Sequence, residues 1–159
     1  MDNHKFRNAM GKFATGVTVI TTEHEGEIHG MTANAFMSVS LNPKLIVVSV
    51  GEKAQMLNKI SESKKFAVNI LSENQQELSM MFAGQMKEKK KINFDRLAGQ
   101  PIINFTVAQI ACEVVNTHVE GDHTLFIGKV IDINIGDDEP LLFFEGQYRA
   151  IEEKSSVLK

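Results

Sequence analysis

The residues with the greatest capacity for chemistry lie between Gly30 and Lys53. A short apolar run, Leu45 to Val50, follows a set of small polar side chains: Thr32, Asn34, Ser38 and Ser40. Small residues let a flat ligand approach the backbone closely, and their hydroxyl and amide groups supply donors and acceptors. Phe36 or Met37 could supply an apolar surface for a ring. The segment is therefore a candidate site for a flat, anionic ring system. Composition alone favours a plainer interpretation, an edge strand and turn of the kind common in all-β proteins.

Two further segments could bind phosphate. Ser49-Val50-Gly51-Glu52-Lys53 leads from a predicted strand to a predicted helix, where free N–H groups and the helix dipole attract anions. Phe82-Ala83-Gly84 ends another predicted helix and precedes the basic run Lys87 to Lys91. The plainer interpretations are an ordinary connection and a solvated charged face. In the functional interpretation, Ala83 and Gly84 allow close backbone approach while a lysine neutralises phosphate.

A histidine and its acidic neighbours form another cluster. His118, Glu120 and Asp122 fall two apart, so they could share one face of a strand and, with His123, bind a hard or borderline metal ion. Gly121 interrupts that strand, and no second pair of ligands lies elsewhere, so a turn is favoured over a metal site. A turn would place the imidazole of His123 at the mouth of a pocket, where it can hydrogen-bond a ligand amide or carbonyl.

The segment from Leu141 to Arg149 offers an aromatic and a cationic side chain. The sequence predicts a buried strand that ends at Gly146, with Tyr148 and Arg149 projecting beyond it. Tyr148 and Arg149 are either a capping aromatic and a surface cation, or a stacking group and a phosphate ligand.

Strands outnumber helices in the predicted order of elements. Apolar spacing predicts helices over residues 4–14, near Met56 to Ile60, and behind a capping box formed by Ser72 and Gln75. Alternating or short apolar runs predict strands from residue 17 and over 28–37, 45–50, 66–71, 107–118, 123–135 and 141–145. Short turns between most of them indicate a mainly β fold, a closed or nearly closed antiparallel barrel with helices covering its ends. Residues 1–159 are expected to form a single domain.

Composition and the absence of two nucleotide-binding motifs narrow the range of possible functions. Hydrophobic residues make up 43% of the chain and charged residues 23%, which is ordinary for a globular protein. A net charge of -3 gives no reason to expect nucleic acid or an anionic membrane as a partner, and no apolar run approaches the roughly 20 residues that span a bilayer. The polar N-terminus is not expected to be a signal peptide, and a single cysteine, Cys112, agrees with a cytoplasmic location. The glycines form neither G-x-G-x-x-G nor a P-loop, so a bound nucleotide would be held in some other way.

Taken in order, these segments resemble the flavin reductase family from about residue 5 to 149. The resemblance lies in Phe6-Arg7 with Gly11-x-Phe13-Ala14-Thr15-Gly16-Val17-Thr18-Val19, then Gly30-Met31-Thr32-Ala33-Asn34-Ala35-Phe36 with Ser38-Val39-Ser40-Leu41-x-Pro43, then Phe66 to Leu71, Gly121-Asp122-His123 and Pro140-Leu141-Leu142. It looks closest to the small reductase components of phenol and 4-hydroxyphenylacetate monooxygenases, which take part in aromatic hydrocarbon catabolism. Ala35 departs from the family, because most members have a serine there, and one hydrogen bond to the flavin is then expected to be lost.

The resemblance implies a fold and an activity. The fold would be an antiparallel FMN-binding split β-barrel of Greek-key type with a few flanking helices, in a homodimer with flavin near the subunit interface. The activity would be NADH-dependent reduction of FAD or FMN, with diffusible reduced flavin passing to a partner monooxygenase. Cofactor contacts would fall on Met31, Thr32, Ala33, Asn34, Ala35, Ser38, Val39, Ser40, Ser49, Val50, Gly51, Glu52, Lys53, Phe82, Ala83, Gly84, His123, Phe144, Gly146, Gln147, Tyr148 and Arg149.

No acid–base residue is expected to be indispensable for hydride transfer, because the flavin carries the redox chemistry and His123 orients the nicotinamide.

Three other functions are compatible with the sequence. A flavin store or sensor would bind the ring without turnover, and a related split barrel could bind haem or a pyridoxal-type ligand. A structural β-barrel subunit would bind no ligand.

Overall fold

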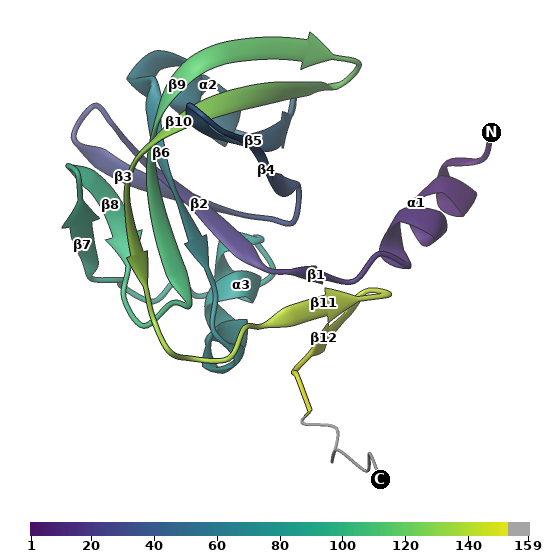
Figure 1. Ribbon diagram of the computed structural model, residues 1–159. Helices are drawn as coiled ribbons and strands as arrows, with labels where there is room; N and C mark the ends of the chain where they lie inside the picture. Colours follow the sequence, from purple (N-terminus) through teal and green to yellow (C-terminus); the bar gives the residue numbers. More distant parts are fainter. Residues whose placement is uncertain (153–159) are drawn as a thin grey trace, which may run out of the picture.

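A seven-stranded antiparallel sheet forms most of the computed structural model, which describes residues 1–152 (Figure 1). Its strand order is β3 (Glu27–Ala33), β2 (Thr18–His24), β6 (Lys65–Ile70), β9 (Ala108–Glu120), β10 (His123–Ile135), β5 (Lys44–Gly51) and β4 (Phe36–Leu41). The chain passes directly from β3 to β4, yet these strands occupy opposite edges of the sheet. Within the described residues no ladder joins the two edges, so hydrogen bonds do not close the barrel. The prediction of a mainly β, antiparallel split barrel is confirmed.

Two smaller sheets accompany the barrel. One contains β1 (Thr15–Gly16), β11 (Leu142–Phe144) and β12 (Gln147–Arg149), and the other is the hairpin of β7 (Phe94–Leu97) and β8 (Gln100–Ile103). The sequence predicted neither this hairpin nor β12. The residues of β7 do not alternate cleanly between apolar and polar, although Ala98 and Gly99 both have positive φ, as two-residue hairpin turns require.

Two strand predictions need correction. The single strand predicted over 28–37 is two strands, because the chain leaves one sheet edge at Asn34 and joins the other at Phe36. A strand was also predicted over 141–145, and the prediction that it is buried was wrong. Leu141 is buried, but Leu142, Phe143 and Phe144 in β11 are only half-buried, since β11 belongs to the small outlying sheet.

Helices α2 (Met56–Ser63) and α3 (Gln76–Phe82) pack against the barrel. Met56 and Ile60 in α2 point into the core, at the helical spacing seen in the sequence. The predicted capping box is confirmed: Gln75 Oε1 accepts a hydrogen bond from Ser72 N at 3.0 Å, at the start of the 3₁₀ turn η1 (Glu73–Gln75) that precedes α3. No helix in the described part of the chain is long and apolar enough to cross a bilayer.

Helix α1 (Asn3–Gly11) does not cover an end of the barrel, contrary to expectation. It stands away from the sheet beyond β1, and none of its residues is buried (Figure 1). The apolar face predicted from its spacing is exposed, with Phe6 at 54% and Met10 at 57% of their accessible surface. Its apolar residues therefore contribute nothing to the core of this chain.

The barrel interior is one apolar cluster. Ile20, Val48, Phe66 and Phe126 are almost completely buried within it, and α2 closes it from one side. A second cluster beneath contains Val17, Val19, Leu71, Ile103 and Leu141. The two clusters hold β2 and β6 in place, and β2 in turn pairs with β3, so the position of the β3 edge depends on the core.

One buried polar side chain links three strands of this core. Asn69 has no exposed surface; its Nδ2 donates to Val19 O at 2.9 Å and its Oδ1 accepts from Ile103 N at 2.8 Å. The amide group is thus hydrogen-bonded on both its donor and its acceptor side, which is the usual condition for burying a polar group.

We expect Asn69→Ala to lower the free energy of unfolding by about 2 kcal/mol, because the backbone N–H of Ile103 would be buried without an acceptor. Urea denaturation at fixed protein concentration measures this. The exposed Asn58→Ala on α2 is the matched control and should change stability by less than about 0.5 kcal/mol. Equal stability of the two variants would contradict the role assigned to Asn69.

Candidate functional site

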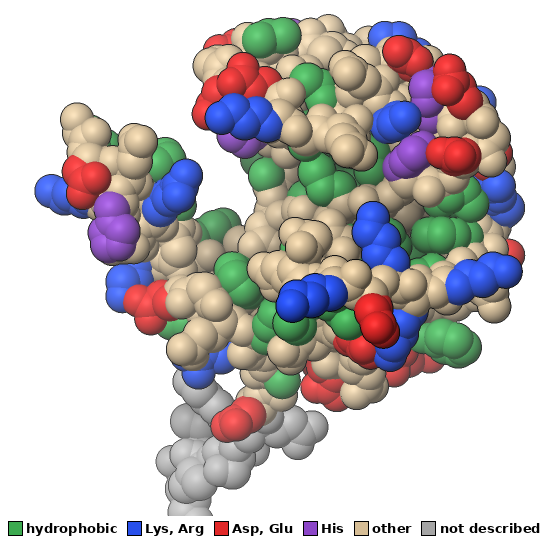
Figure 2. Space-filling view, turned by 180° about the vertical axis from the view of Figure 1, so that it is seen from behind, with side chains coloured by type: hydrophobic (Ala, Val, Ile, Leu, Met, Phe, Trp, Pro, Cys, Tyr) green, Lys and Arg blue, Asp and Glu red, His purple; other side chains and the backbone are tan. Residues whose placement is uncertain are grey.

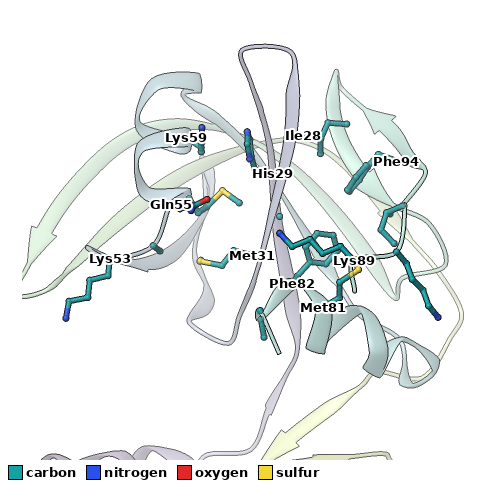
Figure 3. A pocket seen from close by; sticks show the side chains of 17 residues that line it. Ile28, His29, Met31, Lys53, Gln55, Lys59, Met81, Phe82, Lys89 and Phe94 are labelled. Carbon is teal, nitrogen blue, oxygen red and sulfur yellow. The ribbon is translucent and has the colours of Figure 1, made fainter. Parts of the chain in front are cut away.

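A cavity of about 710 Å³ opens along β3, between α2 and the end of α3 (Figure 3). Residues 28–31 of β3 line it, together with residues 53–56 and Lys59 on one side and residues 81–84 on the other. Lys89, Lys90, Ile92 and Phe94 complete the lining. Four lysines, Lys53, Lys59, Lys89 and Lys90, line the cavity, and no carboxylate is among the described residues that do so. Its electrostatic character is therefore cationic, although the chain carries a net charge of -3.

A smaller cavity of about 220 Å³ lies further along the same strand. Thr32, Ala33 and Asn34 line it, with Ser79, Gln85, Phe143 and Tyr148 among its other walls. Ala83 lines both cavities. The two cavities therefore follow each other along β3, with Gly30 and Met31 in the larger one and residues 32–34 in the smaller one.

The absence of a side chain at Gly30 shapes the wall between β3 and α3. A Cβ atom at this position would lie 2.5 Å from Cε1 of Phe82, closer than two such atoms can approach. The Phe82 ring therefore lies against the bare backbone of β3, with the Phe94 ring centroid 6.4 Å from its own in a tilted arrangement. These two rings give the larger cavity an apolar wall that faces Lys53 and Lys59 across it (Figure 3).

Backbone contacts join the other predicted segments to β3. Ala35 O accepts a hydrogen bond from Ser49 N at 3.1 Å, and Gly51 pairs with His123 across β5 and β10. Glu52 N donates to Asp122 O at 2.9 Å, so this N–H of the predicted phosphate segment is already satisfied. Three stretches far apart in the chain, residues 32–35, 49–53 and 122–123, are thereby linked into one surface that reaches the larger cavity at Lys53.

The predicted turn at Gly121-Asp122-His123 is confirmed. His123 is exposed, and its Nδ1 lies 2.7 Å from Oδ1 of Asp122. The hydrogen bond from His123, followed by the charge of the imidazole, lowers the pKa of the Asp122 carboxyl. Nε2 of His123 lies 3.5 Å from the position of a Cβ at Gly51, so the ring leans over the end of β5. Its Nε2 is thus left for a ligand while Asp122 fixes the opposite nitrogen.

Ser79 connects the two sides of the smaller cavity. Thr32 Oγ1 donates to Ser79 O at 2.7 Å, and Ser79 Oγ lies 2.8 Å from the Tyr148 hydroxyl. Tyr148 also packs edge-on against Phe143, with centroids 5.4 Å apart. Tyr148 therefore lies in the cavity wall, as a stacking role would require, whereas the Thr32 hydroxyl already has an intramolecular acceptor.

Several predicted site residues lie outside the two cavities. The Val50 side chain is buried in the core, so any ligand contact from it must come from its backbone. On β4, Ser38, Val39 and Ser40 surround a register shift at the exposed sheet edge. Around the β11–β12 turn, Gly146, Gln147 and Arg149 are exposed and Phe144 is half-buried. Ala35, Ser49, Gly51, Glu52 and His123 also do not line either cavity, and they border the site only through the contacts described above.

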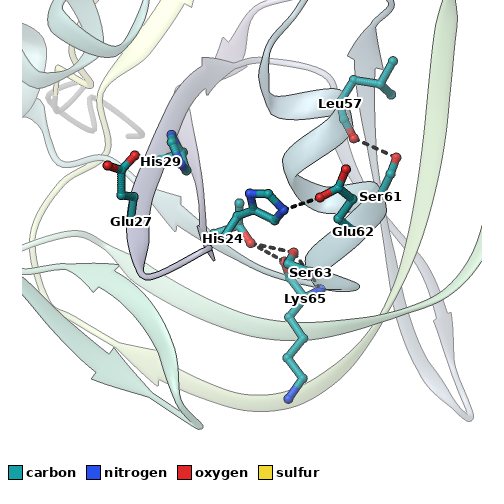
Figure 4. A network of polar contacts seen from close by, with 9 residues as sticks. His24, Glu27, His29, Leu57, Ser61, Glu62, Ser63 and Lys65 are labelled. Atoms are coloured by element: carbon teal, nitrogen blue, oxygen red, sulfur yellow. Dashed lines mark hydrogen bonds and ion pairs between the residues drawn. The ribbon is translucent and has the colours of Figure 1, made fainter.

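In the described part of the chain, the side chains around His118 do not form a grouping of metal-ligating atoms, but three other residues do. That grouping is His24, Glu25 and Glu62, at the β2–β3 turn and the end of α2. Nε2 of His24 contacts Glu62, while Ser63 Oγ lies 2.8 Å from Thr22 Oγ1 (Figure 4). These contacts tie α2 to the β2–β3 hairpin.

Sequence reasoning missed His29, Ser79, Lys59 and Phe94. His29 directly precedes the glycine-rich segment and Lys59 follows Met56 by three residues in α2, so both positions were visible in the pattern. The role of Ser79 depends on two contacts with residues 47 and 69 positions away, which no local pattern encodes.

Known proteins resemble this chain over nearly its whole length. The family model described as "Flavin reductase like domain" matches residues 10–152. The chain belongs to the flavin reductase family. An NADH-dependent flavin reductase of a Rhodococcus species is 42% identical over 149 residues, which cover 92% of this chain and 85% of that protein.

Two other members of the family are also similar. The reductase component of 4-hydroxyphenylacetate 3-monooxygenase from Thermus thermophilus is 35% identical, covering 92% of this chain and 95% of that protein. The solved structure of flavin reductase PheA2 in its native state superimposes with a TM-score of 0.95 at 63% identity, covering 96% of this chain and 100% of that one. The flavin reductase resemblance in the sequence is confirmed.

We expect Gly30→Ala to weaken FAD binding by about tenfold, because the new methyl group displaces the Phe82 ring into the larger cavity. Quenching of flavin fluorescence measures the affinity. Gly16→Ala is the matched control, since nothing lies within 4 Å of its Cβ position, and it should leave the affinity within about twofold. Unchanged binding in Gly30→Ala would show that the flavin does not use this wall.

Proposed function

We propose that this protein is an NADH-dependent flavin reductase that transfers hydride from NADH to FAD and supplies the reduced flavin to a partner monooxygenase. One observation carries the proposal: a cavity lined by four lysines and no described carboxylate continues directly into the small polar segment of β3. A flat ring that carries a diphosphate needs these two neighbouring environments. All three named relatives are reductases, which favours turnover over storage of the flavin.

The size of the larger cavity favours FAD over FMN as the flavin. With the ring over residues 32–35, at the end of β3, the lysines lie where a diphosphate would extend along the strand. The apolar wall of Phe82 and Phe94 beyond them suits an adenine ring. FMN ends at its single phosphate and would leave most of this cavity without a ligand.

Residues of this chain supply binding and orientation to the reaction. Bound flavin supplies the hydride acceptor. Backbone N–H groups at the β3 edge would stabilise negative charge on the reduced ring, because β3 has a pairing strand on one side only within the described chain. Lysines of the larger cavity bind phosphate, and the Tyr148–Phe143 pair closes the smaller cavity.

His123 orients the nicotinamide in this proposal. Asp122 holds its Nδ1, so its Nε2 is free to hydrogen-bond a carboxamide above Gly51. Such a contact is made equally in the ground state and the transition state, so it contributes to binding more than to the chemical step.

NADH oxidation, followed by absorbance with and without added FAD, tests the proposed function. Turnover should require FAD. A protein that binds flavin but does not oxidise NADH would favour the storage function.

We expect His123→Ala to raise KM for NADH about fivefold, because one hydrogen bond to NADH is lost, and to change kcat by less than about twofold. His118→Ala, an exposed histidine on β9, is the matched control and should change neither constant. A fall in kcat at unchanged KM would contradict the positioning role.

We further propose that the protein is a homodimer. Phe13, just after α1, is 78% exposed, and Leu41, on the edge strand β4, is 87% exposed; both are apolar side chains that this chain does not cover. Val119 on β9 is a third, at 74%. Figure 2 shows an open notch between α1 and the barrel. A second copy seated in that notch would cover these exposed apolar side chains. The site residues on β4 and near His123 would then lie close to the interface.

Leu41→Asp should shift the protein from dimer to monomer in light scattering coupled to gel filtration, because a carboxylate cannot be buried unpaired in the interface. Phe105→Asp is the matched control, as Phe105 is 83% exposed in the loop before β9, and it should stay dimeric. A wild-type protein that is monomeric at micromolar concentration would contradict the dimer.

The partner is proposed to be a flavin-dependent monooxygenase of aromatic hydrocarbon catabolism, reached by diffusion of reduced flavin. The Thermus thermophilus relative is named as the reductase component of 4-hydroxyphenylacetate 3-monooxygenase, which supports this proposal. We place the reaction in the cytoplasm, where NADH is available and the buried thiol of Cys112 stays reduced.

A further inference from the structure

His29 is an unassigned imidazole in the lining of the larger cavity. It lies on β3 opposite Thr22 of β2, directly before Gly30. Its Nε2 is buried and has no hydrogen-bond partner, and the nearest carboxylate oxygen, on Glu27, is 4.0 Å away. A buried nitrogen without a protein partner is uncommon in a folded protein, and an ordered water or a ligand can satisfy it. His29 differs from the two other such groups among the described residues, Thr15 Oγ1 and His24 Nδ1, because it lines the larger cavity.

Positive charge dominates the surroundings of His29. Lys59 approaches it from α2 (Figure 3), and Lys53, Lys89 and Lys90 line the same cavity. His24 faces it from β2 and is itself in contact with Glu62 of α2. Two carboxylates oppose these cations: Glu27, on the same strand as His29, is largely exposed, and Glu77 of α3 pairs with Lys90, with its Oε1 2.7 Å from Nζ. No charged group of α3 lines the cavity.

This environment makes the imidazolium form unfavourable in the free protein. Burial lowers the pKa of His29 from its ordinary value, and the charge of Lys59 lowers it further, while Glu27 raises it. His29 is therefore neutral at pH 7. An anion seated among the lysines would reverse the balance, because it would neutralise Lys59 and accept a hydrogen bond from the imidazolium.

We propose that His29 is a further binding residue, which hydrogen-bonds the diphosphate of the dinucleotide in the larger cavity and takes up a proton when that anion binds. The inference rests on the proposed function and extends it, since the same side chain would make the protein bind FAD in preference to flavins that lack a diphosphate. The lysines supply fixed charge, whereas His29 supplies charge only when the anion is present. Its contribution to affinity is thus linked to pH.

The direction of this linkage follows from the shift in pKa. The pKa of His29 is low in the free protein and higher in the complex, so the complex holds more protons between the two values. Affinity for FAD therefore rises as the pH falls through that window and levels off below it. Riboflavin lacks phosphate and should bind with the same affinity throughout.

Calorimetric titration at about pH 8 and about pH 6, in buffers of different ionisation enthalpy, tests the proposal. FAD should bind about fivefold more tightly at the lower pH and take up protons, whereas riboflavin should do neither. His29→Gln keeps a side-chain amide donor but cannot titrate, so its FAD affinity should lose this pH dependence. The exposed His118→Gln is the matched control and should keep it. FMN is unsuitable here because its phosphate monoester titrates in the same range.

The outcomes are separable. FAD that binds without proton uptake, an equal pH effect with riboflavin, or a pH effect that persists in His29→Gln would overturn the role of His29 and leave the reductase proposal intact. FAD that binds at neither pH would overturn the proposed function itself. A pH effect seen with NAD⁺ alone and not with FAD would assign the cavity to the nicotinamide dinucleotide and contradict the proposal as stated. The wild-type comparison of FAD with riboflavin remains decisive should His29→Gln fail to fold.

Discussion

An unpaired sheet edge determines what this protein can bind. The large sheet ends at β3, and the strand that follows it in the chain, β4, lies at the opposite edge instead of pairing with it. One side of β3 is therefore left to α2, α3 and any ligand, and both cavities follow that side. A barrel closed by hydrogen bonds would have satisfied the same backbone groups internally and left no groove of this kind. The missing side chain at Gly30 lets the Phe82 ring lie against this strand, where it forms a wall of the larger cavity.

Charge distribution is the second constraint. The chain is slightly acidic overall, yet the larger cavity concentrates four lysines without a described carboxylate in its lining. Like charges close together repel one another, and their mutual repulsion is relieved when a diphosphate binds. Burial, and after it the charge of Lys59, lowers the pKa of His29. Lys59 therefore contributes both to the preference for a polyanionic ligand and to the neutral state of the imidazole.

The sequence allowed the fold to be predicted from local patterns, such as the capping box at Ser72, and from the order of its motifs. The site was predicted less completely. Turn and helix-end signals correctly placed Gly121 to His123 and Phe82 to Gly84. The contacts that assemble the site are long-range, as between Ala35 and Ser49 or Thr32 and Ser79, and no periodicity encodes them. The apolar face of α1 was also visible in the sequence, but helical spacing shows that a face exists and not what covers it.

A crystal structure of the protein with FAD tests the central claim most directly. The account predicts density for the isoalloxazine ring over residues 32–35, at the end of β3, and for the diphosphate among Lys53, Lys59 and Lys89. His29 should lie within hydrogen-bond distance of a phosphate oxygen. Density for the whole dinucleotide at another surface, with the groove along β3 filled only by water, would contradict it.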